Sequence, residues 1–185
     1  MKSLIGFPAN FLLALALALC STLAAHAGNI YLNLGDIPGE STSKTHKDEI
    51  EVLAFNFEIT SPAPTGGGGG VGKPILSDIS IVKRIDRASP KLAQTLVTGL
   101  HLKSAKLSVE GIAVDQSSLD YYTIDLEDVV ITSVAVSGNE TDPRPTEVIK
   151  LNFNKVTWTY TLLDARGVVK ETTVGSYNKK TSTTQ

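Results

Sequence analysis

The sequence has few of the residues from which most active sites are built. It contains one cysteine, Cys20, and three histidines among 185 residues. A single cysteine excludes an intramolecular disulfide and a cysteine-based zinc site. The charge is nearly balanced, with 17 Lys and Arg against 19 Asp and Glu, so the chain lacks the basic footprint of a nucleic-acid-binding protein. We therefore expect neither a nucleic-acid partner nor a metal centre.

A long apolar run is also missing, because residues 11–19 are too few for a membrane span. Lys2 precedes this run and Ala25-His26-Ala27 follows it, which is the pattern of a secretory signal peptide. We expect cleavage after Ala27, no stable membrane insertion afterwards, and a secreted or periplasmic single domain at residues 28–185. A retained anchor and a lipoprotein at Cys20 are the alternatives, although Leu19 does not fit the lipidation pattern.

Residues 28–185 read mostly as strands. In residues 48–60 the apolar side chains occupy one face up to Ala54 and the other face from Phe55. Residues 146–162 repeat this behaviour, with the change after Phe153. Such a change of face requires a β-bulge or a strand that passes from one sheet to another. It is typical of closed barrels and two-sheet sandwiches.

One helix is expected, over residues 88–98. Ser89 can cap it, Pro90 fits its first position and Gly99 can end it. Its apolar stripe would consist of Leu92, Leu96 and Val97. Residues 176–185 are polar and are expected to fray. The predicted fold class is mostly β, a two-sheet barrel or sandwich with one short flanking helix.

A glycine-rich stretch at residues 61–72 predicts a flexible surface excursion. Its end, GGGGVGKP at residues 67–74, nearly matches a phosphate-binding loop. Pro74, however, replaces the hydroxyl residue that would hold magnesium, and the residues that follow predict a strand, so no helix dipole would meet a phosphate. The pattern therefore favours a loop over a nucleotide site.

The histidines outside the leader are weak candidates for chemistry. His46 lies near Asp48, Glu49 and Glu51, where a metal or acid–base role is conceivable, but a solvated run of charges is favoured. His101 follows the expected helix, where a protonated imidazole would interact favourably with the carboxyl end. We predict no catalytic, cofactor-binding or metal-binding residue, and this favours a binding or structural role over an enzyme.

Several short motifs occur in an order that resembles one protein family, the haemolysin-coregulated (Hcp) tube proteins of bacterial type VI secretion systems. The motifs are YLNL (31–34), IPGES (37–41), HKDEIEVL (46–53), DRASPKL (86–92), GLH (99–101), LEDV (126–129) with Ser133, PTE (145–147) and LNFNKV (151–156). No single motif is decisive, but their joint order over most of residues 30–170 is specific.

The resemblance implies a β-barrel with one helix at its flank. It further implies rings of six copies that stack into a hollow tube, with effectors in the lumen and tip or sheath proteins as further partners, and neither catalysis nor a cofactor. The glycine-rich segment falls where the family is variable. Its residues are candidate contacts between subunits or rings: Gly66, Gly67, Gly68, Gly69, Gly70, Val71 and Gly72.

Two features depart from the family pattern. Family members often carry Arg-Lys where this chain has Glu110 and Gly111. The larger departure is the leader, because tube proteins assemble in the cytoplasm and normally have none. An alternative function is therefore an exported Hcp-like paralogue that acts as a periplasmic or extracellular binding or surface module. The oligomeric state would separate the two.

Overall fold

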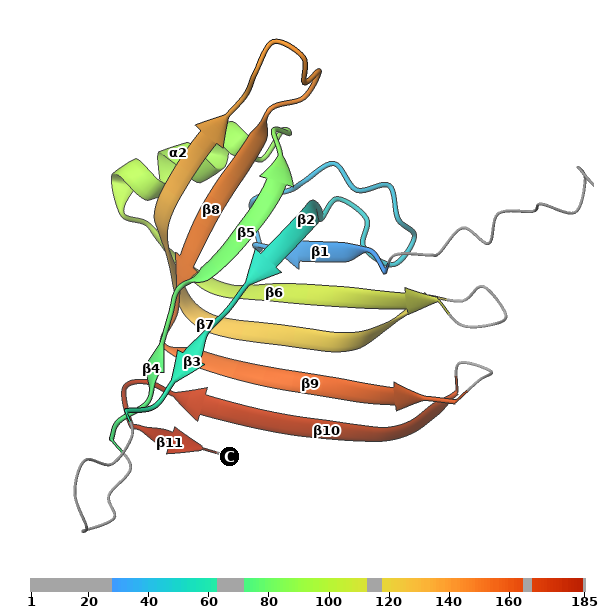
Figure 1. The fold of residues 1–185 in the computed structure, drawn as a ribbon, viewed down its shortest axis with the longest axis vertical. Helices are drawn as coiled ribbons and strands as arrows, with labels where there is room; N and C mark the ends of the chain where they lie inside the picture. The colour runs from blue at the N-terminus through green and yellow to red at the C-terminus, as the bar shows by residue number, and fades with distance from the viewer. Residues whose placement is uncertain (1–27, 63–71, 113–117, 165–167, 185) are drawn as a thin grey trace, which may run out of the picture.

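The computed structural model describes residues 28–62, 72–112, 118–164 and 168–184 (Figure 1). Its helix is α2 (Ser89–Thr98). Its strands are β1 (Ile30–Asn33), β2 (Ile50–Asn56), β3 (Ile59–Thr60), β4 (Ile75–Leu76), β5 (Ile79–Arg84), β6 (His101–Ile112), β7 (Ser118–Ser137), β8 (Thr146–Asn152), β9 (Lys155–Leu163), β10 (Val169–Asn178) and β11 (Thr183–Thr184).

Six of these strands close into a barrel in the order β7-β6-β1-β2-β5-β8, and β8 pairs with β7 to complete it. Each pairing in the barrel is antiparallel. Strands β9, β10 and β11 continue the sheet outward from β7, and β3 and β4 form a separate small sheet. The mostly β prediction, with one short flanking helix, is confirmed (Figure 1).

Strand β7 pairs on the same edge with two successive partners. Its first part pairs with β9 and its second part with β8. The change falls at Asp128, which has a φ of 55°, and the Asn154 N–H donates to the Glu127 carbonyl at 3.1 Å. This is the predicted change of face after Phe153, where the chain leaves the barrel wall and enters the extension.

The other predicted change of face is also present. The register between β2 and β5 shifts between Val52 and Ala54, which places a bulge at Leu53. Inside the barrel, alternate residues of each strand meet in one apolar core. Among its fully buried members are Leu32, Ile50, Ile81, Leu107, Ile124, Ile149 and Leu151.

The start of α2 differs from the prediction. Ala88 and not Ser89 is the N-cap residue, and it provides no side-chain cap. Asp86 Oδ1 instead accepts the Ala88 N–H at 2.8 Å, while Ser89 Oγ–H donates to Glu147 Oε2 at 2.6 Å. The Ser89 hydroxyl is thus occupied by a neighbouring strand, which the local sequence could not reveal.

The rest of α2 follows the prediction with one exception. Gly99 ends the helix with a φ of 64°, and its N–H donates to the Leu96 carbonyl at 3.1 Å. Leu92 is fully buried and Leu96 packs on the core. Val97, however, is 81% exposed, so its place in the buried stripe was predicted wrongly: the barrel covers a narrower face of the helix.

Within the predicted frayed tail, residues 176–178 and 183–184 are strand and residues 179–182 form the turn between them. Strand β10 runs to Asn178, and β11 pairs with its end. Tyr177 pairs with Val156 and is 8% exposed. The ammonium of Lys179 lies 3.8 Å from the centre of the Phe153 ring. These two contacts with the core hold the segment in place.

A buried ion cluster joins β5 and β8 to the helix start. Lys83 is completely buried, and its Nζ donates to Glu147 at 3.0 Å, Asp86 at 2.8 Å and Ser89 at 3.2 Å. Glu147 is also buried. A buried ammonium is tolerated only where carboxylates surround it, and removal of one partner exposes the desolvation cost of the other.

We therefore expect Glu147→Ala to lower the free energy of unfolding by about 3–5 kcal/mol, measured by urea denaturation. The control is Asp48→Asn, which breaks the half-exposed pair between Arg87 and Asp48. Asparagine tolerates the φ of 60° at position 48, and this change should cost less than about 1 kcal/mol. Equal losses in the two variants would contradict the buried-charge argument.

Candidate subunit interface

The outward extension of the sheet carries an apolar face that nothing covers within the described part of the chain. Register places Tyr122 beside Tyr160 and Ile124 beside Trp158, so this face continues the face that lines the barrel core. Beyond the barrel its side chains become exposed. The exposed fractions are 37% for Leu119, 37% for Tyr121, 47% for Tyr160 and 40% for Leu162. We call these four residues the extension patch.

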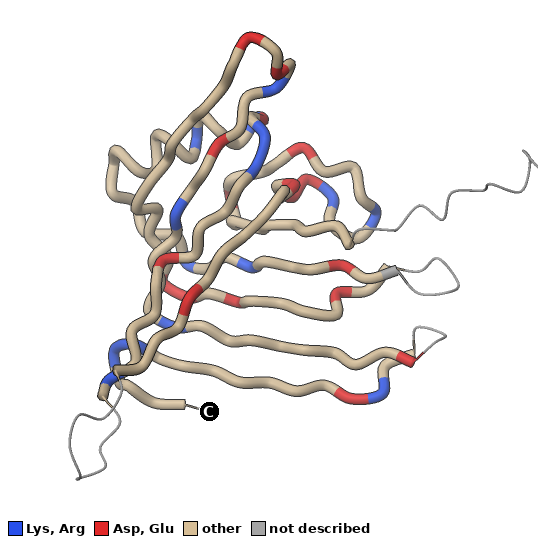
Figure 2. Tube along the Cα trace, in the orientation of Figure 1, with Lys and Arg blue, Asp and Glu red and all other residues tan. Residues whose placement is uncertain are grey.

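The extension patch is ordered by aromatic contact and has few charges around it. The rings of Tyr121 and Tyr160 meet edge to face with their centres 6.5 Å apart. Figure 2 shows β9 and β10 uncharged along most of their length, with Lys, Arg, Asp and Glu near the strand ends. An exposed apolar surface with depleted charge is a mark of a protein–protein contact.

The edge of β10 is a second feature of the extension. One side of β10 pairs with β9 along its length, whereas β11 covers only Tyr177 and Asn178 on the other side. Among the described residues, 169–176 therefore present an unpaired strand edge. Such an edge is a template for pairing with another chain.

His46 lies in a polar cluster beside the extension patch, and the sequence-based preference for a solvated charge was wrong. The side chain is 6% exposed because its ring stacks on Tyr31, with centres 4.3 Å apart. Nδ1 lies 2.9 Å from Glu49 and Nε2 lies 2.9 Å from Asp120. Glu110 is 3.9 Å from Nε2. We call His46 and these three carboxylates the His46 clamp.

Glu110 is held in its ionised form. Burial by itself raises the pKa of this carboxyl, but hydrogen bonds and the charge of His46 outweigh burial and leave the pKa below its ordinary value. Thr45 Oγ1–H donates to it at 2.9 Å and Asn29 Nδ2–H at 3.3 Å. The clamp thereby ties the residues before β2 to the barrel wall at β6 and β7.

His101 was expected to serve the carboxyl end of the helix. It instead pairs with Asp128 at 3.0 Å on the exposed side of the β7 bend. Asp128 also pairs with Lys180 at 2.9 Å. Hydrogen bonds from Lys180, His101 and Asn154 hold the pKa of the Asp128 carboxyl well below its usual range. The prediction missed Asp128 because its partners come from distant segments.

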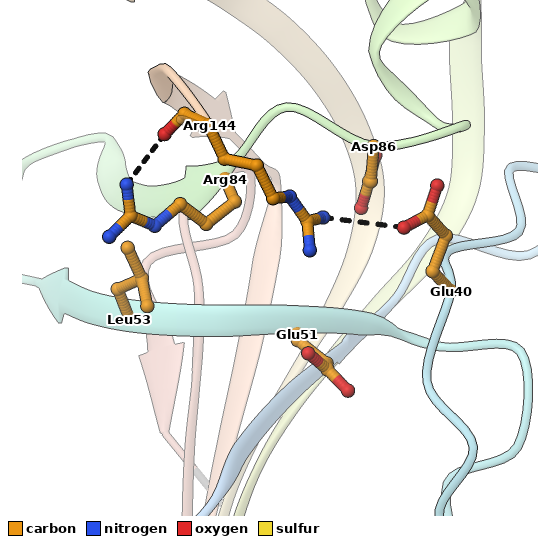
Figure 3. A pocket seen from close by; sticks show the side chains of 6 residues that line it. All are labelled: Glu40, Glu51, Leu53, Arg84, Asp86 and Arg144. Carbon is orange, nitrogen blue, oxygen red and sulfur yellow. Dashed lines mark hydrogen bonds and ion pairs between the residues drawn. The ribbon is translucent and has the colours of Figure 1, made fainter. Parts of the chain in front are cut away.

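A charged pocket at one rim of the barrel is already satisfied internally (Figure 3). It is lined by Glu40, Glu51, Leu53, Arg84, Asp86 and Arg144. Arg144 pairs with Glu40 at 3.3 Å, and Arg84 Nη1–H donates to the Asp142 carboxylate at 2.7 Å. The cavity of about 40 Å³ has room for little more than water. These arginines therefore act as structural braces.

The described residues offer little for a cofactor. No group of three or more His, Cys, Asp or Glu side chains among them has the arrangement of a metal site. Of the seven candidate contact residues in the glycine-rich segment, Gly66, Gly67, Gly68, Gly69, Gly70 and Val71 lie outside the described residues. Gly72 lies inside them, and its carbonyl accepts the Ser61 hydroxyl at 3.4 Å.

Among the described residues, a closed β-barrel whose sheet continues outward into an exposed apolar face is the arrangement that defines the class of this protein. The model of the family described as "Type VI secretion system effector, Hcp" matches residues 31–160. The chain belongs to the Hcp family, the tube proteins of type VI secretion systems, and is a structural tube component.

Individual relatives agree with this family. The chain is 36% identical to "Protein hcp1" of Pseudomonas aeruginosa over 132 residues, which are 70% of this chain and 81% of the relative. It is 27% identical to the "Major exported protein" of the same organism over 138 residues, 71% of this chain and 80% of the relative. Hcp proteins are structural, secreted proteins.

Solved structures share the fold. One, of a type six secretion system protein, has a TM-score of 0.79 and 28% identity, and covers 86% of this chain and all 100% of its own. Hcp1 from Salmonella typhimurium has a TM-score of 0.70 and 28% identity, with 86% and 99% covered. In the part of the chain that the structure describes, no helix is both long and apolar enough to cross a membrane.

The Glu110 contacts give a prediction with a definite sign. Because its pKa is lowered on folding, Glu110 stabilises the fold above its ordinary pKa of about 4.3, and this stabilisation disappears as the pH falls through the lower folded value. Glu110→Gln should lower the free energy of unfolding by about 1–3 kcal/mol at neutral pH.

Urea denaturation between about pH 3 and pH 7 measures this difference. The difference in the free energy of unfolding between wild type and Glu110→Gln should become smaller in acid. Glu140→Gln, on the exposed turn before β8, is the matched control and should show no such gap. A gap of constant size across the pH range would refute the assignment.

Proposed function

We propose that this chain forms a ring of six copies and that the rings stack into the hollow tube of a type VI secretion system. The observation that carries the proposal is the uncovered extension patch, continuous with the barrel core. If a neighbouring copy buried Tyr160 and Leu162, the free energy of association would become more favourable by about 25 cal/mol for each Å² of apolar surface removed from water.

The free edge of β10 supports a ring over a simple two-fold dimer. A strand edge and an apolar face are different surfaces, so one copy can present the edge while the next presents another part of its barrel. Such head-to-tail contacts generate a closed ring when the rotation per copy closes. Closure also hides the edge strand of each copy from nonspecific pairing.

The lumen of such a tube would carry effectors, with tip or sheath proteins as further partners. Residues 66–72 would contribute contacts between subunits or rings, since the neighbouring Ile59 and Ile75 are 49% and 62% exposed. Both isoleucines belong to the small β3–β4 sheet that flanks this segment. A protein of this kind needs neither a catalytic residue nor a cofactor.

We further propose that the leader is cleaved after Ala27 and that residues 28–185 form one secreted or periplasmic domain. The elements of the described fold lie between Ile30 and Thr184, which is compatible with removal of the leader. Intact-mass measurement of the protein from its native host should give a chain that begins at Gly28. A mass that includes residues 1–27 would refute cleavage.

The leader pattern also favours a second candidate, an exported Hcp-like paralogue that acts as a periplasmic or extracellular binding or surface module. Such a module would use the same barrel without ring assembly. Light scattering and negative-stain electron microscopy distinguish the two candidates. The tube proposal predicts six-fold rings or stacked tubes, and a strictly monomeric protein at high concentration would favour the module.

A single substitution tests the interface itself. Leu162→Lys places a charge in the extension patch and should convert rings into monomers in light scattering, because an unpaired charge in a buried contact is strongly unfavourable. The matched control is Val97→Lys, an equally drastic change at an exposed position on the far helix. It should leave the rings intact. Rings that persist in Leu162→Lys would exclude this patch from the interface.

A further inference from the structure

The His46 clamp requires a specific protonation state. Both imidazole nitrogens lie 2.9 Å from carboxylate oxygens, of Glu49 and Asp120. A carboxylate only accepts hydrogen bonds, and a neutral imidazole has one N–H to donate. Both contacts can be hydrogen bonds only when the ring is an imidazolium with a proton on each nitrogen. A neutral ring would lose one contact and place a nitrogen lone pair against a carboxylate.

The surroundings of the ring are acidic. Three carboxylates face the ring: Glu49 from the segment before β2, Glu110 from β6 and Asp120 from β7. The side chain of Glu110 is only 5% exposed. Without the imidazolium, these three negative charges would face one another in a poorly solvated cluster. In the part of the chain that the structure describes, no other cation forms an ion pair with Glu49, Glu110 or Asp120.

The clamp also determines where the extension patch points. Asp120 lies between Leu119 and Tyr121 in β7, and it accepts from Ser108 at 2.8 Å as well as facing His46. The β6–β7 register shifts at this point, between Val109 and Glu110. A bulge re-aims the side chains next to it. Asp120 is thus held on the outer surface of the barrel, and Tyr121 is directed to Tyr160.

We propose that His46 is a positioning residue for subunit assembly, and that its imidazolium makes the ring pH-sensitive. This inference rests on the proposed ring. With the proton present, the clamp holds Asp120 and with it Leu119 and Tyr121 in the geometry of the extension patch. When the proton leaves, the residues before β2 separate from β7, and the patch loses its fixed shape.

Other titratable groups nearby do not account for the same transition. Tyr31 stacks on His46, and burial together with the charges of Glu110 and Glu51 raises its pKa above the ordinary 10. Glu110 titrates in acid, because its pKa is lowered. Neither group changes charge between about pH 6 and pH 9.

The experiment follows the ring by light scattering at about pH 6 and about pH 9 in the purified protein. Wild type is expected to lose rings as the pH rises. His46→Gln places an uncharged amide among the three carboxylates and should have few rings at either pH. His46→Arg stays charged, can stack on Tyr31 and has an adjoining cavity of about 200 Å³ to enter. It should keep its rings at both values.

The control is His101→Gln, which removes the exposed His101–Asp128 pair and should behave like wild type. The proposal is overturned if wild type and His46→Gln have the same ring content at both pH values, or if His46→Arg loses rings as wild type does. A second measurement is hydrogen exchange over residues 41–49, corrected for the intrinsic effect of pH. Protection there should fall in wild type but not in His46→Arg.

The experiments distinguish a failure of the ring proposal from a failure of the His46 clamp proposal. A wild type that is monomeric at every pH contradicts the ring and therefore the role of His46 in assembly. Hydrogen exchange then still tests the clamp, since it needs no oligomer. Rings that form equally at both pH values, with unchanged exchange over residues 41–49, overturn the clamp and leave the ring standing. If His46→Arg does not fold, the ring content of wild type compared with that of His46→Gln tests the role of His46.

Discussion

The double pairing of β7 is the constraint on which the rest of this structure depends. One strand of 20 residues must hydrogen-bond to β8 to close the barrel and to β9 to begin the extension. Both partners lie on the same edge of β7, so the chain has to bend between them, at Asp128 and opposite Phe153 and Asn154. That bend carries the apolar core face out of the barrel, where no described residue of the chain covers it.

Polar groups secure the two ends of this arrangement. At the bend, Asp128 pairs with Lys180, which fixes the C-terminal strands to the barrel. At the far end of β7, the His46 clamp fixes Asp120 and the residues before β2. Charges at both points lie on the outer surface, and the inner face stays apolar. The extension is therefore held in place by ion pairs, while its own apolar face stays available to other proteins.

The chain's departure from the family pattern at Glu110 gains a physical meaning from the structure. A carboxylate at this position accepts from Thr45 and Asn29 and faces His46. An arginine in its place would bring a second cation next to the imidazolium. The leader is the other departure, and it concerns where the protein works. The leader does not affect the barrel, which has the fold of the family.

Periodicity in the sequence was enough to predict most of the barrel strands, the helix, its end at Gly99 and the two changes of face, because these depend on residues close together along the chain. It did not predict the small β3–β4 sheet or β11. The same local pattern misjudged Ser89, Val97, His46 and the strand residues near the C-terminus, 176–178 and 183–184. Each of these depends on a distant strand. Ser89 bonds to Glu147, the barrel wall leaves Val97 exposed, His46 contacts Asp120, and the C-terminal segment packs near Val156. Composition showed that an acidic segment surrounds His46, but only the closed barrel brings Glu110 and Asp120 to its ring. Contacts of that kind are set by strand register, which only tertiary structure decides.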